Sequence, residues 1–159
     1  MRDILLVAGL LVAPCAVSMR QYQPNPSVDA KDPRLSRLTK FFSERGCPLR
    51  EAAVDFLIAA DQNHLDWRLL PSISMIESSG GKDFRNNNVF GWDSNRESFP
   101  SVRAGIHFVA SKLAKSKLYR GKNLESKLQT YNPLPDYVAR VKAVMRTLGP
   151  ESQPVMAED

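Results

Sequence analysis

Apolar residues recur along most of the chain with the spacing of amphipathic helices, and strand-like alternation is nearly absent. The clearest helix begins at Asp32-Pro33, where an N-cap residue precedes a proline at the first helical position, and Gly46 marks its end. The same spacing predicts five further helices, which span about residues 49–61, 66–79, 101–113, 124–129 and 135–148.

Residues 82–99 have a different character. Seven of them are turn formers, namely Asn86, Asn87, Asn88, Gly91, Asp93, Ser94 and Asn95, while Val89, Phe90 and Trp92 favour a few residues of strand. We expect a short hairpin or an irregular loop here. The sequence therefore predicts an α+β fold that is mostly helical and carries one small hairpin or loop lobe after the third helix.

The N-terminus has the features of an export signal. Arg2 precedes an apolar run from Ile4 to Ala13, which is about half the ~20 residues that span a bilayer. Ala16 and Ser18 are small residues, as a cleavage site before residue 19 requires. The predicted organisation is a signal peptide (1–18), a linker (19–31), one domain (32–149) and a disordered tail (150–159). An uncleaved N-terminal anchor is the alternative.

The charge and the cysteines limit the possible partners. The chain has 159 residues and a net charge of +5, which favours an anionic polymer or surface. Export makes nucleic acid the less favoured target, and we expect a periplasmic or extracellular monomer without stable membrane insertion. Cys15 falls inside the signal, so Cys47 has no partner for an internal disulfide. His64 and His107 lie far apart without a third ligand, so no metal or other cofactor is expected.

Glu77 is the candidate catalytic residue. It follows Ile73 by four positions and Leu70 by seven, so its carboxyl lies on the apolar stripe of the third helix. Desolvation and the negative end of the helix dipole both raise a carboxyl pKa. A carboxyl that stays protonated near neutral pH is what general-acid cleavage of a glycosidic bond requires. The alternative is an ordinary solvated acid at a helix end.

The loop after Glu77 is suited to binding a sugar. Its glycines allow close backbone approach, and the amides of Asn87 and Asn88 donate to and accept from hydroxyl and acetamido groups. Trp92 can stack on a pyranose ring. The alternative is that the asparagines are only turn residues and that Trp92 covers the core.

Three segments resemble one known family. "MIESSGGKDFRNNNVFGW", "FPSVRAGIHFVASKLAKSKLYRG" and "TYNPLPDYVARV" are similar to segments of bacterial peptidoglycan endo-β-N-acetylglucosaminidases. The last segment is also similar to the "YN" motif of lytic transglycosylases, which share the lysozyme-like fold. The resemblance covers roughly residues 50–148. It implies a lysozyme-like domain that cleaves the glycan strands of peptidoglycan.

The resemblance also implies roles for individual residues. Glu77 is the general acid, and Tyr131 and Tyr137 lie near it, where one of them stabilises positive charge or orients water. Asn88, Phe90 and Gly91 form the cleft floor. The expected substrate-binding residues are Ser78, Asn87, Asn88, Phe90, Gly91, Trp92 and Tyr137.

A second catalytic carboxylate is harder to identify. Asp93 and Glu97 are the only acids between Trp92 and Pro100. If neither reaches the substrate, either the sugar's own acetamido group assists, or Glu77 acts as acid and base in an anhydro-forming reaction. The functional alternatives to the glucosaminidase are a lytic transglycosylase, a muramidase, a wall-binding module that does not cut, and a basic nucleic-acid binder.

Overall fold

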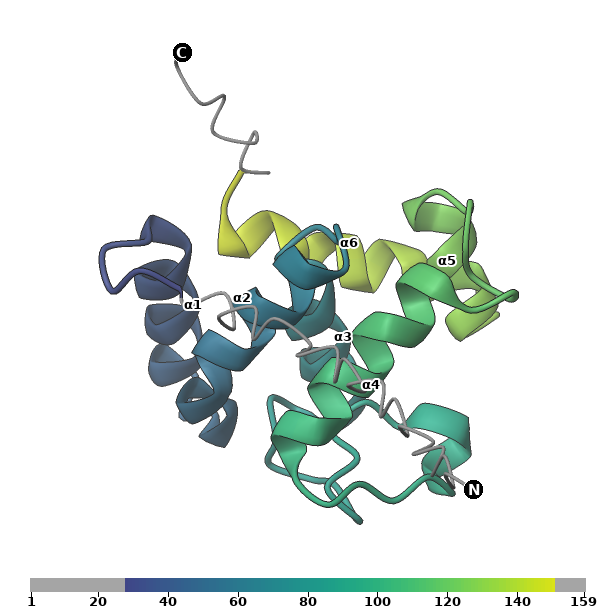
Figure 1. The fold of residues 1–159 in the computed structure, drawn as a ribbon, viewed down its shortest axis with the longest axis horizontal. Coiled ribbons are helices and arrows are strands. Elements are labelled where there is room, and N and C mark those ends of the chain that lie inside the picture. The colour runs from purple at the N-terminus through teal and green to yellow at the C-terminus, as the bar shows by residue number, and fades with distance from the viewer. Residues whose placement is uncertain (1–27, 151–159) are drawn as a thin grey trace, which may run out of the picture.

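The computed structural model describes residues 28–150, and this part of the chain is all-helical (Figure 1). Its elements are α1 (Pro33–Glu44), η1 (Pro48–Ala52), α2 (Ala53–Gln62), α3 (Leu69–Ser78), η2 (Trp92–Asn95), α4 (Val102–Lys115), α5 (Leu124–Tyr131) and α6 (Tyr137–Leu148). The predicted signal peptide, most of the linker and nearly all of the tail lie outside the described residues. None of the helices within residues 28–150 is long and apolar enough to cross a membrane.

The sequence prediction of six α-helices is confirmed, together with the N-cap at Asp32. The Asp32 carboxylate accepts the backbone N–H of Arg34 at 2.8 Å, and Ser101 caps α4 in the same way through Ala104. Three helices begin later than predicted: α2 at Ala53, after η1, α3 at Leu69 and α6 at Tyr137. The Asp66 side chain caps the turn before α3 and not the helix itself.

Aromatic side chains join the helices to the residues between α3 and α4. The ring of Phe56 on α2 lies 5.8 Å from Phe42 on α1 and 6.2 Å from Phe90, measured between ring centroids. All three side chains are fully buried. In Figure 1 the connection between α3 and α4, residues 79–101, lies at the bottom of the view and α6 at the top. We call residues 79–101 the loop segment; Phe90 anchors it to the core.

Of the two forms expected for residues 82–99, the irregular loop is confirmed and the hairpin is wrong, because the loop segment contains no strand. Val89 and Phe90 are buried, but the chain turns directly afterwards into η2. The backbone is left-handed, with φ between 50° and 62°, at Asn86, Asn87, Gly91, Asp93, Ser94 and Asn95. Left-handed residues on both sides of the apolar pair interrupt any extended conformation. The domain is therefore α rather than α+β.

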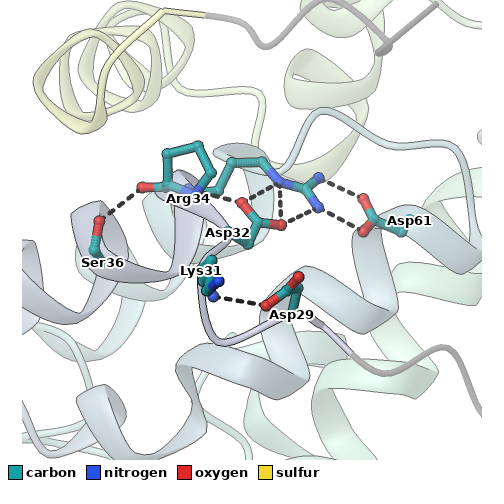
Figure 2. Close-up of polar contacts among 7 residues, drawn as sticks. Asp29, Lys31, Asp32, Arg34, Ser36 and Asp61 are labelled. Atoms are coloured by element: carbon teal, nitrogen blue, oxygen red, sulfur yellow. Dashed lines mark hydrogen bonds and ion pairs between the residues drawn. The ribbon is translucent and has the colours of Figure 1, made fainter. Parts of the chain in front are cut away.

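An arginine links the first two helices. The Arg34 guanidinium binds the Asp32 carboxylate at 2.7 Å and the Asp61 carboxylate at 2.7 and 2.9 Å (Figure 2). Because of the hydrogen bonds from Arg34, the pKa of Asp32 lies below its ordinary value. This bridge holds the start of α1 against the end of α2.

Candidate active site

A cleft of about 830 Å³ lies beside Glu77. This volume is within the range of sites for small ligands. The end of α3, the loop segment, α4 and the residues that follow α4 and α5 all contribute to its walls. The lining residues are Glu77, Gly91, Trp92, Asp93, Ser94, Asn95, Glu97, Phe108, Lys112, Ser116, Leu118, Tyr119, Tyr131, Asn132 and Pro133.

Glu77 is half-buried in the last turn of α3. Its Oε1 accepts a hydrogen bond from the Tyr137 hydroxyl at 2.7 Å. Burial raises the pKa of Glu77 above its ordinary value, while the hydrogen bond from Tyr137 and the positive charge of Arg140 act in the opposite direction. The carboxyl is therefore tuned toward the protonated form by its place on the apolar face.

Gly91 lies directly against the other carboxyl oxygen of Glu77. Its backbone is left-handed, with φ at 60°, and a Cβ atom at this position would lie 3.0 Å from Glu77 Oε2. The missing side chain thus lets the loop segment approach the carboxyl closely. Since Oε1 is bound by Tyr137, Oε2 is the oxygen free to carry a proton toward the cleft.

The two predicted tyrosines lie together but occupy different environments. Their rings are stacked, with centroids 6.1 Å apart and planes 7° apart. Tyr131 lines the cleft, and its hydroxyl donates to the Phe90 carbonyl at 2.6 Å. Tyr137 is only 1% exposed and does not line the cleft. The prediction that Tyr137 contacts substrate is not supported by its contacts, which place its hydroxyl against Glu77 instead.

Both hydroxyl groups stay protonated over the physiological range. Burial, and after it the negative charge of Glu77, raises the pKa of Tyr131 and of Tyr137 far above the ordinary value of a tyrosine. Tyr137 therefore remains a hydrogen-bond donor to Glu77 at any pH at which the domain is folded.

Asn88 and Asn87 hold the loop segment. The Asn88 amide donates to the carbonyls of Trp92 at 2.9 Å and Glu97 at 3.2 Å, and its oxygen accepts the Trp92 N–H at 3.0 Å. The Asn87 amide donates to the Phe99 carbonyl at 2.8 Å. Because these groups are used inside the protein, the prediction that both amides bind sugar is not supported by their contacts.

Ser78 and Phe90 are also structural. The Ser78 hydroxyl donates to the Ser74 carbonyl at 2.9 Å and accepts the Gly81 N–H at 3.2 Å, and its side chain is buried. Phe90 is fully buried in the core. Of the seven residues predicted to bind substrate, only Gly91 and Trp92 line the cleft.

Trp92 belongs to an aromatic wall of the cleft. Its ring contacts those of Phe108, Tyr119 and Tyr131, at centroid distances of 6.1, 6.0 and 5.6 Å. Sequence reasoning did not assign Phe108 to the site. Its neighbours on α4, Val109 and Ala110, are in the core, and only the packing of η2 against α4 turns Phe108 into a wall of the cleft.

The two candidates for a second carboxylate both line the cleft. The Asp93 carboxylate pairs with Arg96 at 2.6 Å, and both side chains are exposed. Glu97 is half-buried, and within residues 28–150 its carboxylate makes no ion pair. Glu97 is therefore the better placed of the two to act on a ligand.

Removing the Tyr137 hydroxyl is expected to raise the pKa of Glu77. The hydroxyl stabilises the charged carboxylate, so Tyr137→Phe favours the protonated form, by about one to two pH units for a hydrogen bond of 1.5–3 kcal/mol to a charged group. An NMR titration of the Glu77 side-chain carboxyl carbon measures this directly. Tyr131→Phe is the control, because its hydroxyl donates to the Phe90 carbonyl instead. An unchanged Glu77 titration in Tyr137→Phe would contradict the assigned role.

Within the described residues, no group of three or more His, Cys, Asp or Glu side chains is placed to hold a metal ion. The sequence matches no protein-family model and no curated protein. The function of the cleft must therefore be argued from its own residues.

Proposed function

We propose that this protein is an exported, lysozyme-like endo-β-N-acetylglucosaminidase that cleaves the glycan strands of peptidoglycan, with Glu77 as general acid. The observation that carries the proposal is the Glu77 carboxyl itself. One of its oxygens is fixed by Tyr137 and the other is directed toward Gly91 at the cleft, while burial raises its pKa. A proton donor of this kind beside a cleft is what glycosidic cleavage needs.

Two further features support a sugar as the ligand. The aromatic wall of Trp92, Tyr119 and Tyr131 provides flat apolar surfaces edged with polar groups, on which pyranose rings can stack. The cleft also combines residues from the three segments that resemble the glucosaminidase family. Glu77, Tyr119 and Tyr131 come one from each segment and line one cleft.

In the proposed reaction, Glu77 Oε2 gives its proton to the glycosidic oxygen as the bond from that oxygen to the anomeric carbon breaks. Positive charge develops on the sugar ring, and the ionised Glu77 carboxylate stabilises it. Water then attacks the anomeric carbon and loses a proton to a base. Glu97 is the candidate for that base, and Asp93 is the second candidate.

One observation favours a transglycosylase as the second candidate. Burial raises the pKa of Glu77, whereas Asp93 is exposed and its carboxylate is paired with Arg96. If Glu97 does not reach the anomeric carbon, the ionised Glu77 can take the proton of the sugar's own 6-hydroxyl. That hydroxyl then attacks the anomeric carbon and gives a 1,6-anhydro product.

Mass spectrometry of the products released from purified sacculi tests the proposal. New reducing ends at N-acetylglucosamine support the proposed enzyme. Reducing ends at N-acetylmuramic acid would instead identify a muramidase, and 1,6-anhydro ends a transglycosylase. If the protein sediments with sacculi but releases no soluble fragments, the proposal fails and the domain is a wall-binding module.

A further inference from the structure

A strongly basic stretch forms one wall of the cleft. Residues 112–122, with the sequence KLAKSKLYRGK, contain five cations and no acid. They form the end of α4 and the connection to α5, and we call them the basic segment. Four of its members line the cleft: Lys112, Ser116, Leu118 and Tyr119.

The cations of the basic segment are not neutralised within the domain. In the part of the chain that the structure describes, no ion pair involves Lys112, Lys115, Lys117 or Arg120, and all four are exposed. Lys112 lies over the ring of Phe108, with its Nζ 5.0 Å from the ring centroid. Several cations elsewhere in the described residues are paired with an acid, as Lys142 is with Glu125 at 2.7 Å.

The backbone of the basic segment is held in place although its charges are free. The Lys127 ammonium group donates to the carbonyls of Leu113 at 2.9 Å and Tyr119 at 2.8 Å. The Lys122 ammonium group donates to the Thr130 hydroxyl at 2.6 Å. These bonds tie both ends of the connection to α5. Lys112 is thus held at the cleft, and the other exposed cations follow it on the same fixed stretch of backbone.

The negative charges of the cleft come from a different part of the chain. Asp93 and Glu97 belong to the loop segment, and Arg96 offsets the charge of Asp93. Glu77 is biased toward its neutral form. The wall made by α4 and the basic segment is therefore positive, whereas the loop segment contributes the acids. A ligand that carries carboxylates on one side would be oriented by this asymmetry.

We propose that the basic segment is a subsite for carboxylate groups attached to the glycan that occupies the cleft. The inference rests on the proposed function and deepens it. Because Lys112 lines the same cleft as Glu77, the anion that it meets belongs to the chain being cut. In peptidoglycan these groups are the carboxylates of the peptide attached to N-acetylmuramic acid or, where no peptide is attached, the free lactyl carboxylate of that sugar. The subsite would favour such strands over neutral polymers of N-acetylglucosamine.

Binding to soluble strands tests the subsite without depending on cleavage. Lys112→Gln/Lys115→Gln is made in a Glu77→Gln background, and its affinity is measured for peptide-bearing strands, peptide-free strands and carboxyl-reduced peptide-free strands. We expect about fivefold weaker binding to one or both acidic strands, for two exposed ion pairs of roughly 0.5 kcal/mol each. Binding to the carboxyl-reduced strand should not change. In the protein that keeps both lysines, the difference in affinity between acidic and carboxyl-reduced strands should shrink as the salt concentration rises.

The outcomes separate this inference from the proposed function. An effect on peptide-free strands assigns the lactyl carboxylate, and an effect only on peptide-bearing strands assigns the peptide. The control Lys40→Gln/Arg50→Gln removes two exposed cations from α1 and η1 and should bind all strands normally. If the lysine variant binds every strand as tightly as its Glu77→Gln parent does, or loses as much affinity for the reduced strand as for the acidic ones, the subsite is overturned. Lysine-dependent binding without any cleavage by the Glu77 protein would leave the subsite standing and overturn the enzyme.

Discussion

Replacing Glu77 by glutamine is expected to lower the rate of fragment release from sacculi by about 10³-fold, within the range that general acids contribute. The amide has nearly the shape of the carboxyl and can still accept the Tyr137 hydrogen bond through its oxygen. It has no proton to give to the glycosidic oxygen. The measurement is the initial rate of turbidity loss, checked by counting new reducing or anhydro ends.

Two matched variants show whether the loss is specific. Asp93→Asn and Glu97→Gln each remove one other carboxylate from the cleft. If hydrolysis needs a second acid, Glu97→Gln should lose activity to a similar degree and Asp93→Asn much less. If the anhydro route operates, both should retain most of their activity. If Glu77→Gln released fragments at the wild-type rate, the proposed mechanism would be wrong.

Gly91→Ala is expected to lower activity by about 10²-fold, because a displacement of about 1 Å at a reacting group can cost that much. The new Cβ would lie 3.0 Å from Glu77 Oε2, so the carboxyl or the loop segment must move. The strand contacts much more of the cleft than Gly91, so its binding should weaken far less than the turnover rate falls. The measurement is kcat and KM on soluble peptidoglycan strands.

Gly46→Ala separates this contact from backbone strain. Gly46 has φ at 58°, almost the same as the 60° of Gly91, but a Cβ there would meet nothing within 4 Å. Both variants should lose about 1–2 kcal/mol of unfolding free energy from the left-handed backbone. Only Gly91→Ala should lose activity. Equal activities of the two variants would show that the approach of Gly91 to Glu77 is not required.

The helices could be predicted because their signals are local. Asp32-Pro33 and Ser101 fix the starts of α1 and α4 through hydrogen bonds to residues two or three positions away. The position of Glu77 on an apolar face also follows from the helical repeat alone. Neither inference needs knowledge of what packs against the helix.

The loop segment could not be predicted in the same way. "NVFGW" has the composition of a short strand, but a strand must pair with a second extended segment in register. The left-handed residues Asn86, Asn87 and Asp93 interrupt the extended backbone on both sides, so no such pairing forms. From the sequence, the side-chain amides and carboxylates of these residues are equally suited to stabilising turns and to binding sugars. Only the folded structure shows that the Asn88 side chain is occupied by the backbone of the loop segment.

Tyr137 illustrates the limit of local reasoning most clearly. The sequence places it near the site by resemblance, but its burial and its bond to Glu77 depend on how α6 packs on α3. The same is true of Phe108 and Lys112, which line the cleft only because α4 passes beside η2. Membership in the lysozyme-like family itself stays a prediction.

The bond between Glu77 and Tyr137 joins positions separated by 60 residues. A growing chain that has emerged from the ribosome only as far as α5 therefore has the acid but neither its partner nor the helix that covers it. Such an intermediate lacks the hydrogen bond that fixes Glu77 Oε1. In the proposed mechanism, the general acid is therefore complete only once α6 has docked on α3.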